Sequence, residues 1–376
     1  MLDIKQIKWL CFFCWYLLHG HKNKVIKMRI EREKWLDVAK MIGIFLVVYG
    51  HSTEGPNSIT FIYWFHMPLF FIISGYLFKP VNSVSELKFF IKKLTCRLLV
   101  PYCTYLVLFS LYDITTEVLR GTISTSNLLN EVISLIIGGR FITGVHGVFW
   151  YVTCLFITQI LFAVICLYFK KNIVRLSIVI ACYLIAHFET IKLIPHIGKN
   201  TFNQISIPWN MDVALLAIFF LGLGFFAKKF IASISNFIGI SCISLSIFYM
   251  TLYKMNKLDY HLSLKYLRYD HLFLDALIPI TMTIAVLFLC QKLAKLQFVQ
   301  PCTIFGKESL TIMYIHIFAN AVISQFFDYG PLLYTVIGLA VPMLTKKFII
   351  ESQPTIKPFF IGLNVKRKQN LKVRTA

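Results

Sequence analysis

Charged residues are scarce in this chain of 376 residues. Asp, Glu, Lys and Arg make up only 15%, whereas 57% of the residues are hydrophobic and the mean hydropathy is +0.70. A soluble protein of this length would not carry that balance, and apolar runs of about 20 residues are what a bilayer requires of its spanning helices. The composition therefore excludes an ordinary soluble domain and predicts an all-α, polytopic integral membrane protein.

Acidic residues are the scarcest of the charged ones. The chain has 17 Asp and Glu against 38 Lys and Arg, which gives a net charge of +21. The sequence offers no basic groove with interleaved aromatic residues, so we expect no nucleic-acid partner. Lys and Arg instead form short clusters between apolar runs, as in the cytoplasmic loops of membrane proteins. This distribution predicts a multi-pass protein of the inner (plasma) membrane with both termini in the cytoplasm.

Motifs for metal, redox and phosphate-loop chemistry are also missing. The ten cysteines are scattered, and Cys11-x-x-Cys14 has no partner pair, so we expect no zinc or redox site. No carboxylate–histidine set has the spacing of metal ligands, and Gly222-x-Gly224 lies inside an apolar run rather than in a phosphate-binding loop. The chain also lacks internal repeats and paired broken helices, which would favour a transporter.

Long apolar runs are what the sequence has instead. We predict about ten transmembrane helices, at residues 36–53, 59–78, 97–114, 149–169, 173–188, 211–227, 231–253, 271–290, 309–327 and 331–348. The stretch Leu128–Ile137 is too short to cross and is predicted to be re-entrant or interfacial. Residues 28–350 form the membrane domain, and residues 351–376 form a basic cytoplasmic tail that contacts anionic lipid or is disordered. Residues 1–27 are an extra N-terminal segment, expected to be either a membrane anchor or an incorrectly assigned start ahead of Met28.

Ionisable residues within the first predicted span are the most informative feature of the chain. Lys40 and His51 are eleven residues apart. A helix turns by about 100° and rises by about 1.5 Å per residue, so both share one face and lie about 16 Å apart along the axis. Asp37 lies one turn before Lys40 on the same side. Ionisable groups inside a membrane helix usually face the bundle interior and are functional candidates.

Four further segments complete a recognisable pattern. They are Tyr63-Trp-Phe-His66-Met-Pro-Leu-Phe-Phe-Ile-Ile-Ser-Gly75-Tyr-Leu-Phe78, Lys92-Lys93-Leu-Thr-Cys-Arg97-Leu-Leu-Val-Pro101-Tyr102, Phe149-Trp150-Tyr151-Val-Thr-Cys-Leu155-Phe156 and Ser309-Leu-Thr-Ile-Met-Tyr-Ile-His316. Together with the Lys40–x10–His51 pattern, they resemble the integral-membrane acyltransferase 3 family, most closely its branch related to fucose 4-O-acetylases. The resemblance covers most of residues 28–350 and makes them the expected acyltransferase domain.

The resemblance implies transfer of an acetyl or other short acyl group from a coenzyme A thioester to a sugar hydroxyl. The expected donor is acetyl-CoA, and the expected acceptor is a bacterial surface polysaccharide or glycan precursor. No bound cofactor is expected, and membrane lipids are the other expected partners. A sugar hydroxyl must lose its proton as it attacks, and histidine, with a reference pKa of about 6.5, suits that task. His51 is the expected catalytic residue, either as general base or as a carrier of the acyl group.

The expected donor-binding residues are the cations of the first and third spans. Lys40, Lys93 and Arg97 are placed to meet the phosphates of coenzyme A. Many relatives carry two arginines three residues apart, whereas here Lys93 stands in for one of them and offers a point charge rather than a bidentate fork. Lys93 and Arg97 could alternatively be plain positive-inside anchors.

Five residues are candidates for a supporting or substrate-binding role, and each has a structural alternative. They are Asp37, His66, Trp150, Tyr151 and His316. Asp37 is expected to position or neutralise Lys40. His66 could bond locally at a kink beside Pro68, His316 could be structural, and Trp150 with Tyr151 could belong to an interfacial aromatic belt. His51 itself could be an interfacial histidine.

An alternative function is a transporter or flippase for a glycan or small anion, because ten spans with buried His and Lys also suit a permeation path. The choice of acceptor is expected to depend on three loops, at residues 115–148, 189–210 and 254–270.

Overall fold

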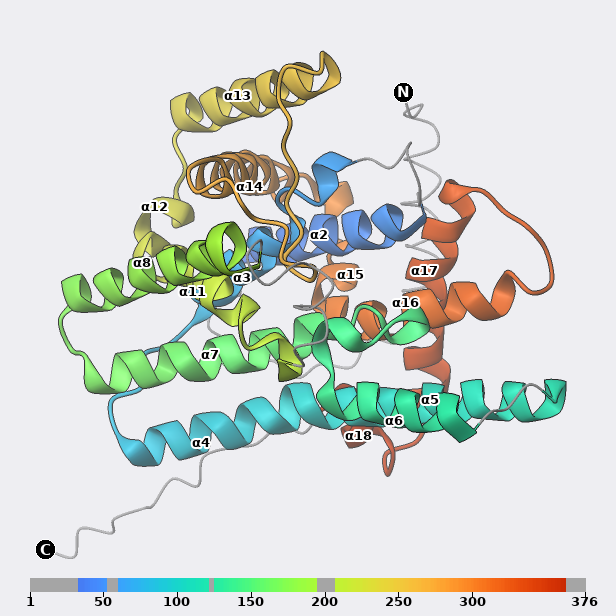
Figure 1. Cartoon of the computed structure of the whole chain (residues 1–376). Coiled ribbons are helices and arrows are strands. Elements are labelled where there is room, and N and C mark those ends of the chain that lie inside the picture. Colours follow the sequence, from blue (N-terminus) through green and yellow to red (C-terminus); the bar gives the residue numbers. More distant parts are fainter. Residues whose placement is uncertain (1–32, 53–59, 122–124, 195–206, 363–376) are drawn as a thin grey trace, which may run out of the picture.

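The computed structural model describes residues 33–52, 60–121, 125–194 and 207–362. Within these ranges the chain forms helices joined by turns and no β-strand, which confirms the predicted all-α, multi-pass membrane fold. Most of the long helices run side by side (Figure 1). The predicted extra segment 1–27 and most of the predicted basic tail lie outside the described residues, so the cytoplasmic placement of both termini stays a prediction.

In chain order the α-helices are α2 (Lys34–Ser52), α3 (His66–Leu77), α4 (Val84–Leu94), α5 (Val100–Arg120), α6 (Thr125–Ile137), α7 (Trp150–Tyr168), α8 (Asn172–Phe188), α11 (Val213–Phe226), α12 (Lys228–Ala232), α13 (Asn236–Lys254), α14 (Leu274–Leu293), α15 (Thr303–Lys307), α16 (Ser309–Ile323), α17 (Pro331–Thr345) and α18 (Lys357–Ile361). Short 3₁₀ or π turns connect or extend them: η1 (Thr60–Ile62), η2 (Thr95–Leu99), η3 (Gly139–Phe141), η4 (Gly144–His146), η5 (Glu189–Leu193), η6 (Pro208–Asn210), η7 (Gln297–Val299) and η8 (Lys346–Ile350).

Eight helical runs among the described residues are long and apolar enough to cross a bilayer, rather than the ten that were predicted. They are Thr60–Leu77, Val84–Arg120, Gly144–Tyr168, Asn172–Leu193, Pro208–Phe226, Asn236–Lys254, Leu274–Leu293 and Pro331–Ile350. The other two predicted spans are also helices. α2 carries Asp37, Lys40 and His51, and α16 has only 15 residues, which is short for a span.

Helix α2 lies inside the bundle and packs against α3, α14, α15, α16 and α17. Three contacts along the two helices fix its antiparallel alignment with α3. The Tyr63 hydroxyl donates to the Gly50 carbonyl over 3.0 Å, the Phe70 ring fills the space beside Gly43, and the rings of Tyr76 and Trp35 lie 5.3 Å apart. The end of α2 that carries His51 is therefore the end at which α3 begins.

Glycines allow a close backbone contact between helices α3 and α11. A methyl group added at Gly75 would overlap the backbone of Leu221, and one added at Gly224 would overlap the backbone of Ile72. Close packing through small residues is common between membrane helices, since the backbones can then approach and gain dispersion contacts. Gly224, inside α11, serves this packing.

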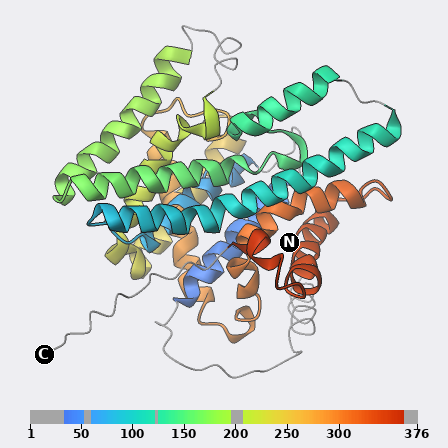
Figure 2. The ribbon, with the colours of Figure 1, turned by 90° about the horizontal axis from the view of Figure 1, so that it is seen from below.

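The third predicted span, 97–114, proves to be part of one long helical run. α4, η2 and α5 are continuous from Val84 to Arg120, so the run of 37 residues begins earlier and ends later than predicted. Within η2 the Val100 N–H bonds to the Thr95 carbonyl, which makes a π turn just before Pro101. Proline has no N–H to offer the preceding turn, and a π turn accommodates that loss. Seen from below, this run crosses the whole molecule (Figure 2).

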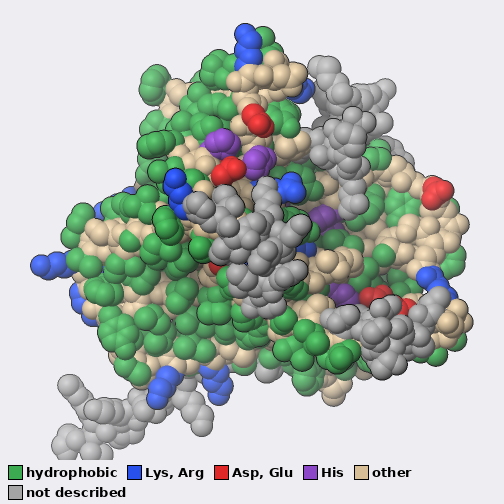
Figure 3. Space-filling model, in the orientation of Figure 1, with side chains coloured by type: hydrophobic (Ala, Val, Ile, Leu, Met, Phe, Trp, Pro, Cys, Tyr) green, Lys and Arg blue, Asp and Glu red, His purple; other side chains and the backbone are tan. Residues whose placement is uncertain are grey.

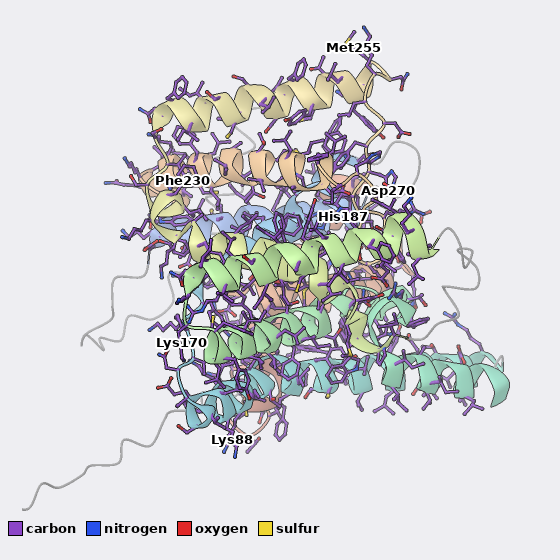
Figure 4. The ribbon with its side chains drawn as sticks, turned by 60° about the vertical axis from the view of Figure 1, so that its left-hand side comes forward. Lys88, Lys170, His187, Phe230, Met255 and Asp270 are labelled. Atoms are coloured by element: carbon purple, nitrogen blue, oxygen red, sulfur yellow. The ribbon has the colours of Figure 1, made fainter. Side chains whose placement is uncertain are left out.

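The two ends of the bundle differ in charge. Lys88, Lys170 and Phe230, which follows Lys228 and Lys229, lie at one end of the helices, and Met255 and Asp270 lie at the other (Figure 4). Between the ends the visible surface is mostly hydrophobic (Figure 3). We refer below to the end with Lys88 and Lys170 as the basic end and to the end with Asp270 as the loop end.

Candidate active site

A single large cavity, with a volume of about 990 Å³, brings together most of the residues predicted for the site. Its wall is built by α2, α3, α4, η2, α7 and α16, together with loops at the loop end. The predicted site residues that line it are Lys40, His51, His66, Lys93, Arg97, Trp150 and Tyr151. Asp37 and His316 are buried nearby but do not line the cavity. Residues that lie far apart in the sequence thus share one space.

Four cations line the part of the cavity that lies toward the basic end. They are Lys40 of α2, Lys79 after α3, Lys93 of α4 and Arg97 in the π turn η2. Lys93 and Arg97 both face the cavity although the helix widens into the π turn at Thr95. No acidic side chain lines the cavity among the described residues. A long anionic ligand would therefore meet only positive charge here.

Histidines line the other part of the cavity. His51 is half-buried in the last turn of α2, and His66 opens α3 opposite it. The His66 Nδ1–H donates to the Ile62 carbonyl over 2.7 Å, which leaves Nε2 as the acceptor of that ring. The predicted local bonding of His66 and its place in the cavity wall are thus both present. Tyr63, which sequence reasoning did not single out, also lines the cavity. Its hydroxyl donates to the carbonyl of Gly50, next to His51 in the chain, and its ring centroid lies 5.3 Å from that of His66.

His316 of α16 contacts His51 from behind the cavity wall. It is fully buried, and its ring centroid is 5.4 Å from that of His51. Its Nδ1 lies 2.9 Å from the carbonyl oxygens of Ile312 and Met313. Carbonyls only accept, so Nδ1 carries the proton and a neutral ring keeps a lone pair on Nε2. No described residue bonds to this buried Nε2.

Trp150 and Tyr151 begin α7 and are nine-tenths buried rather than exposed as an interfacial belt. Both line the cavity, and the Tyr151 ring lies 5.5 Å from that of Phe71. Asp37 is buried in the first turn of α2, where the backbone of Gly306 in α15 packs closely against its carbonyl. Trp150 and Tyr151 therefore form part of the cavity wall, whereas Asp37 lies where α2 packs on α15.

Lys265 is another residue of the site that sequence reasoning missed. It comes from the loop between α13 and α14, is 9% exposed and lines the cavity. Its Nζ donates to the carbonyls of Ile142 and Gly147 over 3.1 Å and 2.8 Å. These partners are more than 100 residues away in the chain, and no sequence pattern around Lys265 announces the contact. Segments 143–148 and 262–266, from two of the three loops expected to choose the acceptor, do line the cavity.

Among the described residues, no group of three or more His, Cys, Asp and Glu side chains is arranged to hold a metal ion. Two buried ion pairs lie outside the cavity wall. Arg140 and Asp212 form a buried pair between η3 and the start of α11, and His187 pairs with Asp275 over 3.2 Å between α8 and α14.

Comparison with known proteins gives one match. A family model described as an acyltransferase domain matches residues 33–345, which is most of the chain and contains every residue that lines the cavity. No curated protein and no solved structure matches the chain.

Proposed function

We propose, from the premise that this chain belongs to the acyltransferase 3 family of membrane proteins, that it is an O-acyltransferase acting on a glycan. The proposed reaction moves an acetyl or other short acyl group from a coenzyme A thioester to a sugar hydroxyl. The proposed acceptor is a bacterial surface polysaccharide or glycan precursor at the inner membrane, as expected of the fucose 4-O-acetylase-related branch. The carrying observation is the one cavity that joins a cluster of cations to a pair of histidines.

The cationic part of the cavity supports binding of the donor. Coenzyme A carries a diphosphate and a further phosphate, and Lys40, Lys93 and Arg97 offer them ammonium and guanidinium donors. Lys79 adds a fourth cation to the same part of the wall. Lys40 and His51 lie about 16 Å apart along α2, so the flexible arm of the donor can carry its thioester toward the histidines.

His51 is proposed as the general base. The acceptor hydroxyl attacks the thioester carbonyl and gives its proton to the His51 ring, the C–O bond forms, and the C–S bond breaks. The protonated ring then returns the proton to the leaving thiolate, which departs as free coenzyme A. Since one continuous cavity contains both the cations and His51, we favour direct transfer over an acyl group carried on His51.

His316 is proposed as the residue that positions His51. A neutral His316 with its proton fixed on Nδ1 presents the Nε2 lone pair inside the bundle, beside the His51 ring. That lone pair can accept a hydrogen bond from one nitrogen of His51 and leave the other nitrogen as a base. His66, Trp150 and Tyr151 are proposed to hold the acceptor, since aromatic rings offer an apolar face to a sugar ring.

Family membership favours acyl transfer over the transport alternative. The deciding experiment follows radiolabelled acetyl-CoA into glycan in membranes that contain the wild type, His51→Ala or His261→Ala. His261 is a matched control because it is 43% exposed in its side chain and lies outside the cavity. We expect label in glycan with the wild type and His261→Ala, and a loss of about 10²- to 10⁴-fold with His51→Ala.

Full labelling by His51→Ala at normal membrane levels would remove His51 from the mechanism. Movement of glycan across vesicles without covalent change, and without dependence on coenzyme A, would establish transport instead.

A further inference from the structure

A buried lysine stands at the loop end of the cavity, away from the cations assigned to the donor. Lys265 belongs to the loop that joins α13 to α14, and that loop packs on the segment preceding His66. The rings of Tyr260 and Trp64 lie 5.1 Å apart and fix this contact. Lys265 therefore lies with His66 and His51 rather than with the cations of the basic end.

The surrounding loops hold Lys265 rigidly. Asn210 donates through its side chain to the Lys265 carbonyl over 3.4 Å. The Lys265 Nζ bonds to the carbonyls of Ile142 and Gly147, and it lies 5.1 Å from the centre of the Tyr266 ring. The buried Arg140–Asp212 pair anchors the segment that precedes Ile142 to the start of α11. The ammonium is thus fixed in place, as expected of a preorganised binding group.

Two carbonyls use only part of what an ammonium offers. Lysine has three N–H donors, so one remains for whatever occupies the cavity that Lys265 lines. No Asp or Glu among the described residues pairs with it, and no acidic side chain lines the cavity within that part of the chain. Carbonyl dipoles do not neutralise a charge, and a buried charge without a counter-ion is destabilising. Burial lowers the pKa of Lys265 to about 8, because the charged form loses its hydration.

The cavity wall beside this group is made of small residues. A methyl group added at Gly144 would meet no atom within 4 Å, whereas one added at Gly147 would lie 3.0 Å from the Gly144 carbonyl oxygen and 3.5 Å from the Lys265 Nζ. Gly144, Gly147 and Thr143 line the cavity at this point. A small charged group can therefore approach the ammonium without displacing a bulky side chain.

We propose that Lys265 binds an anionic group of the acceptor, a carboxylate or a phosphate on the glycan, next to His51. The inference rests on the proposed acyl transfer and names the acceptor class as acidic or phosphorylated sugars. The anion supplies the counter-ion that the protein does not, and it holds the acceptor so that a hydroxyl is presented to His51. The donor phosphates are bound separately, by the cations of the basic end.

A binding experiment tests this without relying on catalysis. The thermal stability of the full chain in detergent is measured with glucuronate, with glucose 1-phosphate and with glucose, while saturating coenzyme A occupies the donor cations. We expect at least one of the two anions to stabilise the wild type, and the arm that does so distinguishes a carboxylate from a phosphate. Lys265→Gln keeps N–H donors for the two carbonyls but lacks the charge, and we expect it to bind that anion about 10- to 100-fold more weakly.

Lys265→Arg, which keeps the charge, should retain binding. Lys257→Gln is the matched control, because Lys257 is an exposed lysine of the same loop that does not line the cavity. Glucose that stabilises as strongly as either anion, or a Lys265→Gln variant with unchanged anion affinity, would overturn the proposal. The unliganded melting temperature of each variant shows whether the loop itself remains folded.

A transfer experiment separates this inference from the proposed function. With acetyl-CoA as donor, methyl glucuronoside and methyl glucoside are compared as acceptors. We expect Lys265→Gln to raise the KM for the glucuronoside and to leave the KM for acetyl-CoA unchanged. Equal use of both acceptors, unaffected by the substitution, would refute the anion site while acyl transfer stands. Anion binding that depends on Lys265, without transfer to any acceptor, would support the site and refute the proposed function.

Discussion

At the level of single residues, the two histidines that meet at the cavity wall are proposed to have different roles. His51, the proposed base, lines the cavity, whereas His316 is fully buried and lies against His51. Under the proposed mechanism, substitution of His51 removes the base, and substitution of His316 leaves a base whose orientation is no longer fixed. The two losses should therefore be distinguishable in kinetics.

We expect His316→Ala to lower kcat by about a hundredfold, since a misdirected catalytic group loses near-attack geometry. His316→Gln, whose amide oxygen can accept a hydrogen bond as the imidazole nitrogen does, should recover part of that loss, and the pH at half-maximal rate should shift in His316→Ala. Initial rates over a pH series provide the measurement. Equal losses in both variants with an unchanged pH profile would mean that His316 only fills space.

The cations of the long helical run should act on donor binding rather than on chemistry. We expect Arg97→Ala to raise the KM for acetyl-CoA by about 10- to 100-fold with little change in kcat, because the guanidinium binds phosphate equally in the ground and transition states. Arg97→Lys should fall between, as a point charge replaces a fork. Lys88→Ala, on the exposed side of α4, serves as the control. A fall in kcat without a change in KM would move Arg97 from the donor site to the reacting centre.

At the scale of elements, the contact between α3 and α11 sets the shape of the cavity. α3 carries His66 at its first turn, and its position depends on the backbone approach at Gly75 and Gly224. A displaced α3 would move His66 away from His51. Stability and activity are thus coupled through two residues that touch no substrate.

We expect Gly224→Leu to destabilise the fold by about 1–3 kcal/mol or more, because the added side chain would overlap the backbone of Ile72. Gly330→Ala is the matched control, since a methyl group there meets nothing within 4 Å. Thermal unfolding in detergent measures the difference. Comparable melting temperatures in both variants would show that α3 and α11 can move apart without loss of stability.

The sequence predicted elements better than it predicted their ends. Hydropathy located helices at all ten predicted spans, yet two of those helices are polar or short, because the bundle rather than lipid surrounds them. The run from Val84 to Arg120 was predicted only from residue 97, since its first turns are amphipathic and charged. The π turn reflects how the backbone is hydrogen-bonded just before Pro101, which hydrophobic periodicity does not reveal.

The candidate site was likewise predicted only in part. Lys40 and His51 were paired by helical spacing, and the family resemblance supplied Lys93, Arg97, His66, Trp150 and Tyr151; the structure places all of them on one cavity. Lys265 was not predicted, because the carbonyls that hold it are more than 100 residues away in the sequence and are brought close only by the packing of loops. Asp37 is buried against α15 and does not line the cavity, and its expected role of positioning or neutralising Lys40 stays a prediction.

For the whole molecule, a cavity whose described walls carry cations and no carboxylate has a consequence for the end of the catalytic cycle. Free coenzyme A keeps every phosphate of the donor, so the charges that capture the substrate also retain the product. We expect departure of coenzyme A to limit turnover, which would appear as a burst of one acetylated acceptor per protein in rapid-quench experiments. Added salt should then speed the steady state by screening, up to the concentration at which donor capture fails. A steady rate without a burst would place the slow step in the chemistry.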